Sequence, residues 1–80
     1  MSTMIESLRE QVGLNGAAAI LANEILVLHD QKEQGQLTKE EYIFLMQDIA
    51  LVRAQSELAG DEIASRYIIM AIVELLSMVP

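Results

Sequence analysis

Hydrophobic and polar positions along the chain repeat with the three- and four-residue spacing of amphipathic helices. Segments of about 4–12, 17–34, 39–59 and 61–79 carry this spacing, and the residues within them are mostly good helix formers. Glycines separate the segments, and the only proline is the last residue of the chain. The pattern therefore predicts a single all-α domain over residues 1–80.

The strongest local signal joins the second and third segments. Gly35 is placed to end the second helix in the left-handed conformation. Thr38 and Glu41 have the spacing of a capping box, which begins the third helix. Because the connection is short, we expect an antiparallel helical hairpin, extended by the outer segments to three or four helices. The expected main apolar face of the third helix consists of Tyr42, Leu45, Met46, Ile49 and Val52.

The predicted helices carry more apolar surface than a single apolar stripe along one side of each helix would give. The last segment is apolar around most of its circumference, and Ile20 and Val27 lie away from the main stripe of the second. An 80-residue chain has little material to surround such helices, and large apolar patches usually mark contact sites. We therefore expect the helices to pack between chains, although a compact four-helix monomer is the alternative. The expected contact residues are Phe44, Leu51, Leu58, Tyr67, Ile68, Ile69, Ile72, Leu75, Leu76 and Val79.

Composition and charge narrow the possible functions. Hydrophobic residues make up 52% of the chain, which is too many for a disordered acidic tail. The absence of cysteine excludes a disulfide scaffold and a zinc-thiolate site. Five basic residues against twelve acidic ones argue against nucleic-acid binding. No apolar run reaches the roughly 20 residues of a membrane span, and no signal peptide is evident, so we expect a cytoplasmic protein.

The stretch from Asp30 to Glu41 resembles the calcium loop of EF-hand proteins. Asp30, Gly35 and Glu41 match the first ligand, the sharp turn and the bidentate glutamate of that loop. Lys32 and Gln34 stand where oxygen ligands of the third and fifth positions belong, and a lysine repels a cation. Helix capping explains the same residues without metal, so we expect none. The stretch is also similar to a short helical hairpin of many bacterial proteins, which implies an interaction element.

Few residues suggest catalysis. His29 is the only histidine, and Glu33 one turn later is its one neighbour for a surface metal. Glu24, Asp48 and Glu74 lie within apolar runs, where burial could raise a carboxyl pKa, but pairing with Arg53 or Arg66 explains them equally well. The sequence contains no phosphate-binding loop and no nucleophile motif. We therefore expect no enzyme and no cofactor.

These observations favour a small assembly or structural subunit that forms a homo-oligomer or binds an obligate protein partner, as in phage or bacterial complexes. A chaperone-like or regulatory protein that covers an apolar or basic partner is the second interpretation. A calcium-responsive hairpin is the third.

Overall fold

The computed structural model describes residues 3–80, and this range contains helices and turns but no strand. The helices are α1 (Thr3–Leu14), α2 (Ala19–Glu33), α3 (Lys39–Asp48), η1 (Ile49–Arg53), α4 (Ala54–Glu57) and α5 (Glu62–Ser77). The π-helical segment η1 joins α3 to α4 without a break, because the residues at both junctions keep helical backbone angles. The all-α prediction is confirmed, and the third predicted segment corresponds to the α3–η1–α4 rod.

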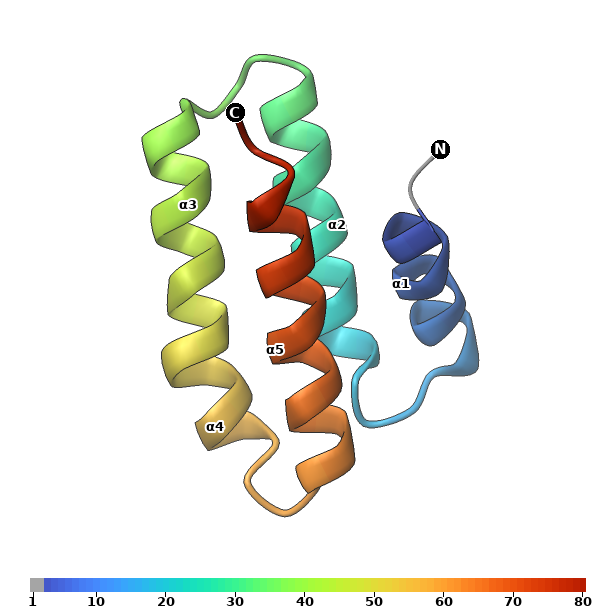
Figure 1. Ribbon diagram of the computed structural model, residues 1–80. Coiled ribbons are helices and arrows are strands. Elements are labelled where there is room, and N and C mark those ends of the chain that lie inside the picture. Colours follow the sequence, from blue (N-terminus) through green and yellow to red (C-terminus); the bar gives the residue numbers. More distant parts are fainter. Residues whose placement is uncertain (1–2) are drawn as a thin grey trace.

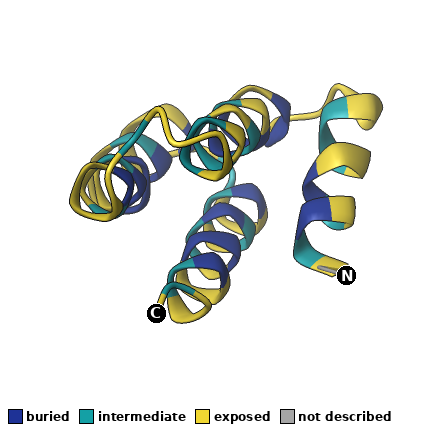
Figure 2. Ribbon diagram, turned by 90° about the horizontal axis from the view of Figure 1, so that it is seen from above, coloured by how far each residue is buried: buried dark blue, intermediate teal, exposed yellow. Residues whose placement is uncertain are grey.

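Three of the helical units form a row, and α5 packs on one side of it. Seen from above, the rod, α2 and α1 lie side by side in that order (Figure 2). The rod and α2 run antiparallel and are joined by the short connection at the top of Figure 1. α5 contacts α1, α2 and α3. On the other side of the row no helix of residues 3–80 covers the surface, and we call this side the open face.

The turn between α2 and α3 has the geometry that its sequence predicts. Gly35 has a φ of 77°, and its amide donates to the carbonyl of Lys32 at 3.1 Å. The next amide, of Gln36, donates to the carbonyl of Gln31 at 2.8 Å, which completes a Schellman motif. Thr38 and Glu41 then form both hydrogen bonds of a capping box. The predicted hairpin turn is therefore present within the chain.

The row and α5 enclose an apolar core. No polar or charged residue is buried among the described residues. Tyr67 of α5 lies half-buried, and its hydroxyl is 2.5 Å from the Oγ of Ser7, which links α1 to α5. The largest fully buried side chains are Leu8, Leu21, Ile25, Tyr42, Met46, Ile68 and Ile72. Every long helix thus contributes to one shared core.

The π turn changes the helical register of the rod. The amide of Ala54 donates to the carbonyl of Ile49, five residues back. A π turn holds one residue more than an α turn, so the residues that follow it are turned back by about one position. In an uninterrupted α-helix Arg53 would face the core, in line with Tyr42 and Met46. The π turn puts Ala54 in that place and leaves Arg53 at the flank of the rod.

This shift corrects two of the residue assignments made from the sequence. In a regular helix Phe44, Leu51 and Leu58 would share one face, because they are spaced by sevens. Phe44 and Leu51 are exposed, but Leu58 is only 8% exposed and belongs to the core. Val52 was expected on the main apolar face and is 56% exposed instead. Both differences follow from the extra residue in η1.

The dimensions are those of a compact chain of this length. The Cα radius of gyration is 11.8 Å, against about 11.6 Å expected for 80 residues. The accessible surface is 5044 Å², close to the roughly 4,800 Å² expected for this mass. The chain therefore encloses a core of its own, and any contact between chains must use surface that remains outside this core.

Candidate interaction surface

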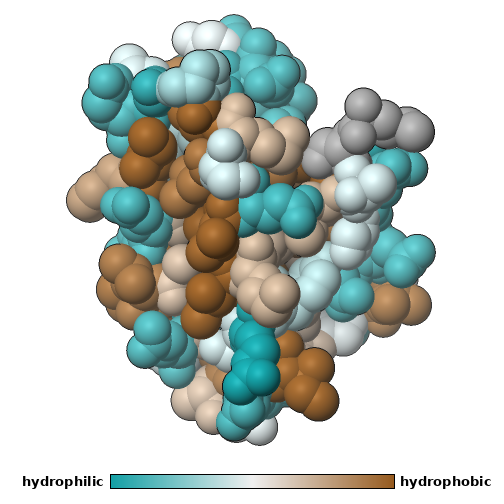
Figure 3. Space-filling model, in the orientation of Figure 1, coloured by the Kyte–Doolittle hydropathy of each residue, from teal (hydrophilic) through white to brown (hydrophobic). Residues whose placement is uncertain are grey.

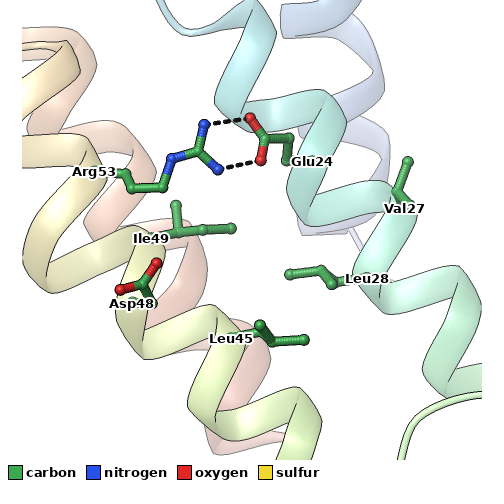
Figure 4. Close-up of a pocket in the computed structure, with 7 residues that line it drawn as sticks. All are labelled: Glu24, Val27, Leu28, Leu45, Asp48, Ile49 and Arg53. Atoms are coloured by element: carbon green, nitrogen blue, oxygen red, sulfur yellow. Dashed lines mark hydrogen bonds and ion pairs between the residues drawn. The ribbon is translucent and has the colours of Figure 1, made fainter.

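A groove of about 220 Å³ runs between α2 and the α3–η1 rod (Figure 4). α5 lies behind the groove in this view, so the groove is on the open face. Val27 and Leu28 line it from α2, and Leu45 and Ile49 line it from the rod. Val27 is 47% exposed, so the rim of the groove presents apolar surface to solvent.

An ion pair spans one end of this groove. The guanidinium of Arg53 donates two hydrogen bonds to the carboxylate of Glu24 on α2, and the bond from Nη2 to Oε2 is 2.7 Å long. Its Nε donates to Oε2 of Glu57 at 2.6 Å. Because the π turn directs Arg53 toward α2, the guanidinium neutralises the carboxylate at this end of the groove. The sequence suggested this pairing as one explanation of Glu24.

Two pKa values shift in the neighbourhood of the α2–α3 hairpin. The hydrogen bonds that Arg53 donates to Glu24, and then those to Glu57, raise the pKa of Arg53 further above its usual value, so its charge is permanent. Burial, together with the negative charge of Glu33, raises the pKa of Tyr42 above 10.0. The ammonium of Lys32 lies 5.3 Å from the centre of the Tyr42 ring.

Two further hollows each share one lining residue with the groove. One of about 320 Å³ lies between α1 and α2, where Arg9 and Val27 are among its lining residues. The other, of about 200 Å³, lies on the outer side of the rod, where Phe44, Asp48 and Val52 are among its lining residues. Val27 and Asp48 also line the central groove. The groove therefore has a neighbouring hollow on the α1 side of α2 and another on the outer side of the rod.

The ten contact residues expected from the sequence fall into three groups. Phe44 and Leu51 are exposed on the outer edge of the rod. Leu58, Ile68, Ile72 and Leu75 are buried in the chain's own core, so in this fold they cannot reach another chain. The partly buried residues, packed against the core, are Tyr67, Ile69, Leu76 and Val79. Most of the expected contact residues of α5 therefore pack inside this chain.

The outer side of α5 also exposes apolar residues. Apolar side chains run lengthwise over the face that carries α5 and are interrupted by polar ones (Figure 3). Among them Ile63 is 85% exposed, and Met70 and Val73 are exposed as well. An exposed ion pair of Glu62 and Arg66, at 3.1 Å, lies on the same helix. The N-terminal part of α1 extends to the same side of the row as α5 (Figure 2).

Sequence reasoning did not identify the residues that join the hollows of the open face. Arg9 lies on α1, whereas Asp48 and Val52 lie on the rod, and only the packing of these elements against α2 brings their hollows next to the groove. Two residues of α2 did indicate an additional apolar face. Ile20 and Val27 are seven residues apart and lie outside the main apolar stripe of this helix. Both are exposed in the structure.

In the EF-hand-like stretch, the side chains that match calcium ligands form hydrogen bonds within the turn between α2 and α3. Asp30 Oδ2 accepts a hydrogen bond from Gln34 Nε2 at 3.0 Å. Glu41 Oε1 accepts one from the backbone amide of Thr38 at 2.8 Å. Lys32 lies toward the Tyr42 ring and within 3.7 Å of Glu33. Across residues 3–80 no group of three or more acidic or histidine side chains is arranged to hold a metal ion.

The remaining candidate residues do not converge on a site. His29 packs edge-on against the Tyr42 ring, with centroids 6.5 Å apart. Its Nδ1 is buried and has no hydrogen-bond partner among the described residues. Asp48 and Glu74 are exposed, on different helices. His29 shares its hollow with Arg9 and Asp30. Asp48 lines the central groove together with Glu24, whose carboxylate is bound by Arg53.

Comparisons with protein-family models, curated proteins and solved structures found no match to this chain. Within residues 3–80, none of the helices has the length and apolar character needed to cross a membrane.

Proposed function

We propose that this chain is a non-enzymatic assembly or structural subunit that associates with other copies of itself through apolar surface. The observation that carries this proposal is the open groove between α2 and the rod, whose apolar lining comes from Val27, Leu28, Leu45 and Ile49. Scattered exposed apolar residues are normal on soluble proteins, but a contiguous patch usually marks a contact site.

The energetics are consistent with reversible association. Covering about 400 Å² of apolar surface gains about 10 kcal/mol, against an association cost of about 4–15 kcal/mol. The acidic residues support the same role, because a net charge of −7 keeps a protein with exposed apolar surface soluble.

Sedimentation velocity across a wide range of concentrations tests the proposal. We expect the average mass to rise above 8.9 kDa as concentration increases. A folded particle of 8.9 kDa at every concentration, with no binding of a hydrophobic dye, would contradict it.

A chaperone-like or regulatory binder of a basic, apolar partner is the second candidate. The excess of acidic residues favours it, as does Asp48, which is exposed in the central groove and forms no ion pair with another described residue. This candidate predicts a chain that stays monomeric alone and binds a cationic amphipathic peptide. Titration of such a peptide, with an anionic peptide of the same apolar content as the control, separates the two functions.

A further inference from the structure

We propose that the groove between α2 and the rod, together with the hollow on the outer side of the rod, binds a helix of a different protein. That helix carries a lysine or arginine between two large apolar side chains. Asp48, which lines both hollows, pairs with the cation of the partner. This inference rests on the second candidate function and adds to it the surface and the residue pattern of the partner.

The two hollows offer apolar sites next to Asp48. In the groove, Leu28 points from α2 toward the rod, and Leu45 and Ile49 point from the rod toward α2 (Figure 4). On the outer side of the rod, Phe44 is 69% exposed. The two volumes, about 220 and 200 Å³, are below the roughly 300–1,000 Å³ of small-molecule pockets. Each hollow therefore suits one apolar side chain of a larger partner better than a free small molecule.

The shape of the groove favours a helix as the occupant. The antiparallel α2 and rod leave an open groove between them, and an amphipathic helix docks into such a groove through side chains three, four or seven positions apart. The π turn supports a binding role, because π turns frequently occur at functional sites. The segment η1 supplies Ile49, Val52 and Arg53 to the two hollows.

The charges around the groove favour a basic partner. The guanidinium of Arg53 is shared by the carboxylates of Glu24 and Glu57. Asp48 forms no ion pair with another described residue. Three carboxylates and one guanidinium leave an excess of negative charge at the groove. A lysine or arginine of the partner offsets this excess, which favours binding and fixes the orientation of the partner.

A second copy of this chain is a poorer source of that cation. The chain has a net charge of −7, and both of its lysines fall within residues 30–41, which also contain four acidic residues. Each arginine also has an acidic neighbour: Arg9 shares its hollow with Asp30, Arg53 binds Glu24, and Arg66 binds Glu62. A different, basic protein is therefore the better match to Asp48.

Synthetic helical peptides test this assignment. The probe peptide carries two leucines seven positions apart with an arginine midway between them, and the control peptide has glutamate in place of the arginine. The wild type should bind the arginine peptide about tenfold more tightly, because one peptide places an attractive charge at Asp48 and the other a repulsive one. Isothermal titration calorimetry measures both affinities.

Charge exchange locates the cation of the peptide. Asp48→Lys should reverse the preference in favour of the glutamate peptide. Asp30→Lys makes the same change in the hollow on the α1 side and should keep the preference for arginine. Both positions are exposed, and circular dichroism checks that each variant is folded.

Truncation of one apolar side chain locates the leucines. Phe44→Ala should weaken binding of the arginine peptide about tenfold, because this side chain lines the outer hollow. Ile63→Ala, on the exposed side of α5, should leave the affinity unchanged.

The outcomes separate this inference from the proposed functions. A wild type that binds neither peptide overturns the second candidate function and this inference with it. Binding of the arginine peptide that survives both Asp48→Lys and Phe44→Ala overturns only the assigned surface. Loss of self-association in these two variants, with unchanged peptide binding, identifies a second copy as the occupant and also overturns the inference. Self-association itself is tested by sedimentation of the chain alone, whatever the peptides do.

Discussion

The Arg53 side chain shows how one residue serves two helices. It joins the rod to α2 through Glu24 and also binds Glu57 one turn further along. The side chains of Arg53 and Glu24 are 30% and 36% exposed, so water screens part of their attraction. The stabilisation is therefore modest, although the hydrogen-bond geometry is bidentate.

A double-mutant cycle of Glu24→Gln and Arg53→Met should give a coupling energy of about 1 kcal/mol. Urea denaturation of the four proteins measures it. The Glu62–Arg66 pair is the matched control, because it is more exposed and lies within one helix. We expect its coupling energy to be about 0.3 kcal/mol. Equal coupling in the two pairs would contradict the role assigned to the contact between helices.

Burial of Tyr42 makes stability depend on alkaline pH. The folded chain holds the phenol proton to a higher pH than the unfolded chain, whose tyrosine pKa is near 10.0. The stabilisation is complete below pH 10 and is lost as the pH rises through the folded pKa, by up to about 1.4 kcal/mol per pH unit. Tyr42→Phe should flatten this decline in denaturant unfolding. Tyr67→Phe is the control and should retain it.

At the level of elements, the chain divides into parts that local sequence determines and parts that it does not. The turn from Gly35 to Thr38 was predictable, because its hydrogen bonds join residues within six positions of one another. The π turn was not, because an α-helical path is equally available locally. It is favoured by long-range packing, which places Ala54 in the core in place of Arg53. The same reason explains why the contact residues expected on α5 are largely internal.

Deletion of Val52 should convert η1 to a regular α-helical turn. Since the extra residue of the π turn is removed, the parts of the rod before and after it keep their register, and the free energy of unfolding should change by less than about 1 kcal/mol. Deletion of Asn23, which is exposed in the regular helix α2, should cost at least about 3 kcal/mol because it turns core residues outward. Urea denaturation compares them, and similar losses would contradict this account of η1.

For the whole molecule, the main finding is that one chain encloses a core and still leaves one broad side uncovered. The composition alone could not show which apolar residues lie in the core and which lie on the surface, because it gives their number and not their positions. Phe44 and Leu51 are exposed, whereas Ile68 and Ile72 pack inside the core. The apolar surface that remains exposed is smaller than the sequence suggested.

Self-association should make thermal stability depend on concentration. If the folded state is a dimer, each tenfold rise in protein concentration should raise Tm by about 4 °C. Val27→Glu should remove this dependence without changing the Tm at low concentration by more than a few degrees. Differential scanning calorimetry measures both, and a concentration-independent wild-type Tm would count against association.

The contact between Tyr67 and Ser7 has a practical consequence. The chain contains no tryptophan and two tyrosines, so its intrinsic emission comes from those two rings alone. In the Tyr42→Phe variant the remaining fluorophore is Tyr67, whose hydroxyl touches α1. Its emission then becomes an optical reporter of whether the first helix is docked, and it requires no label.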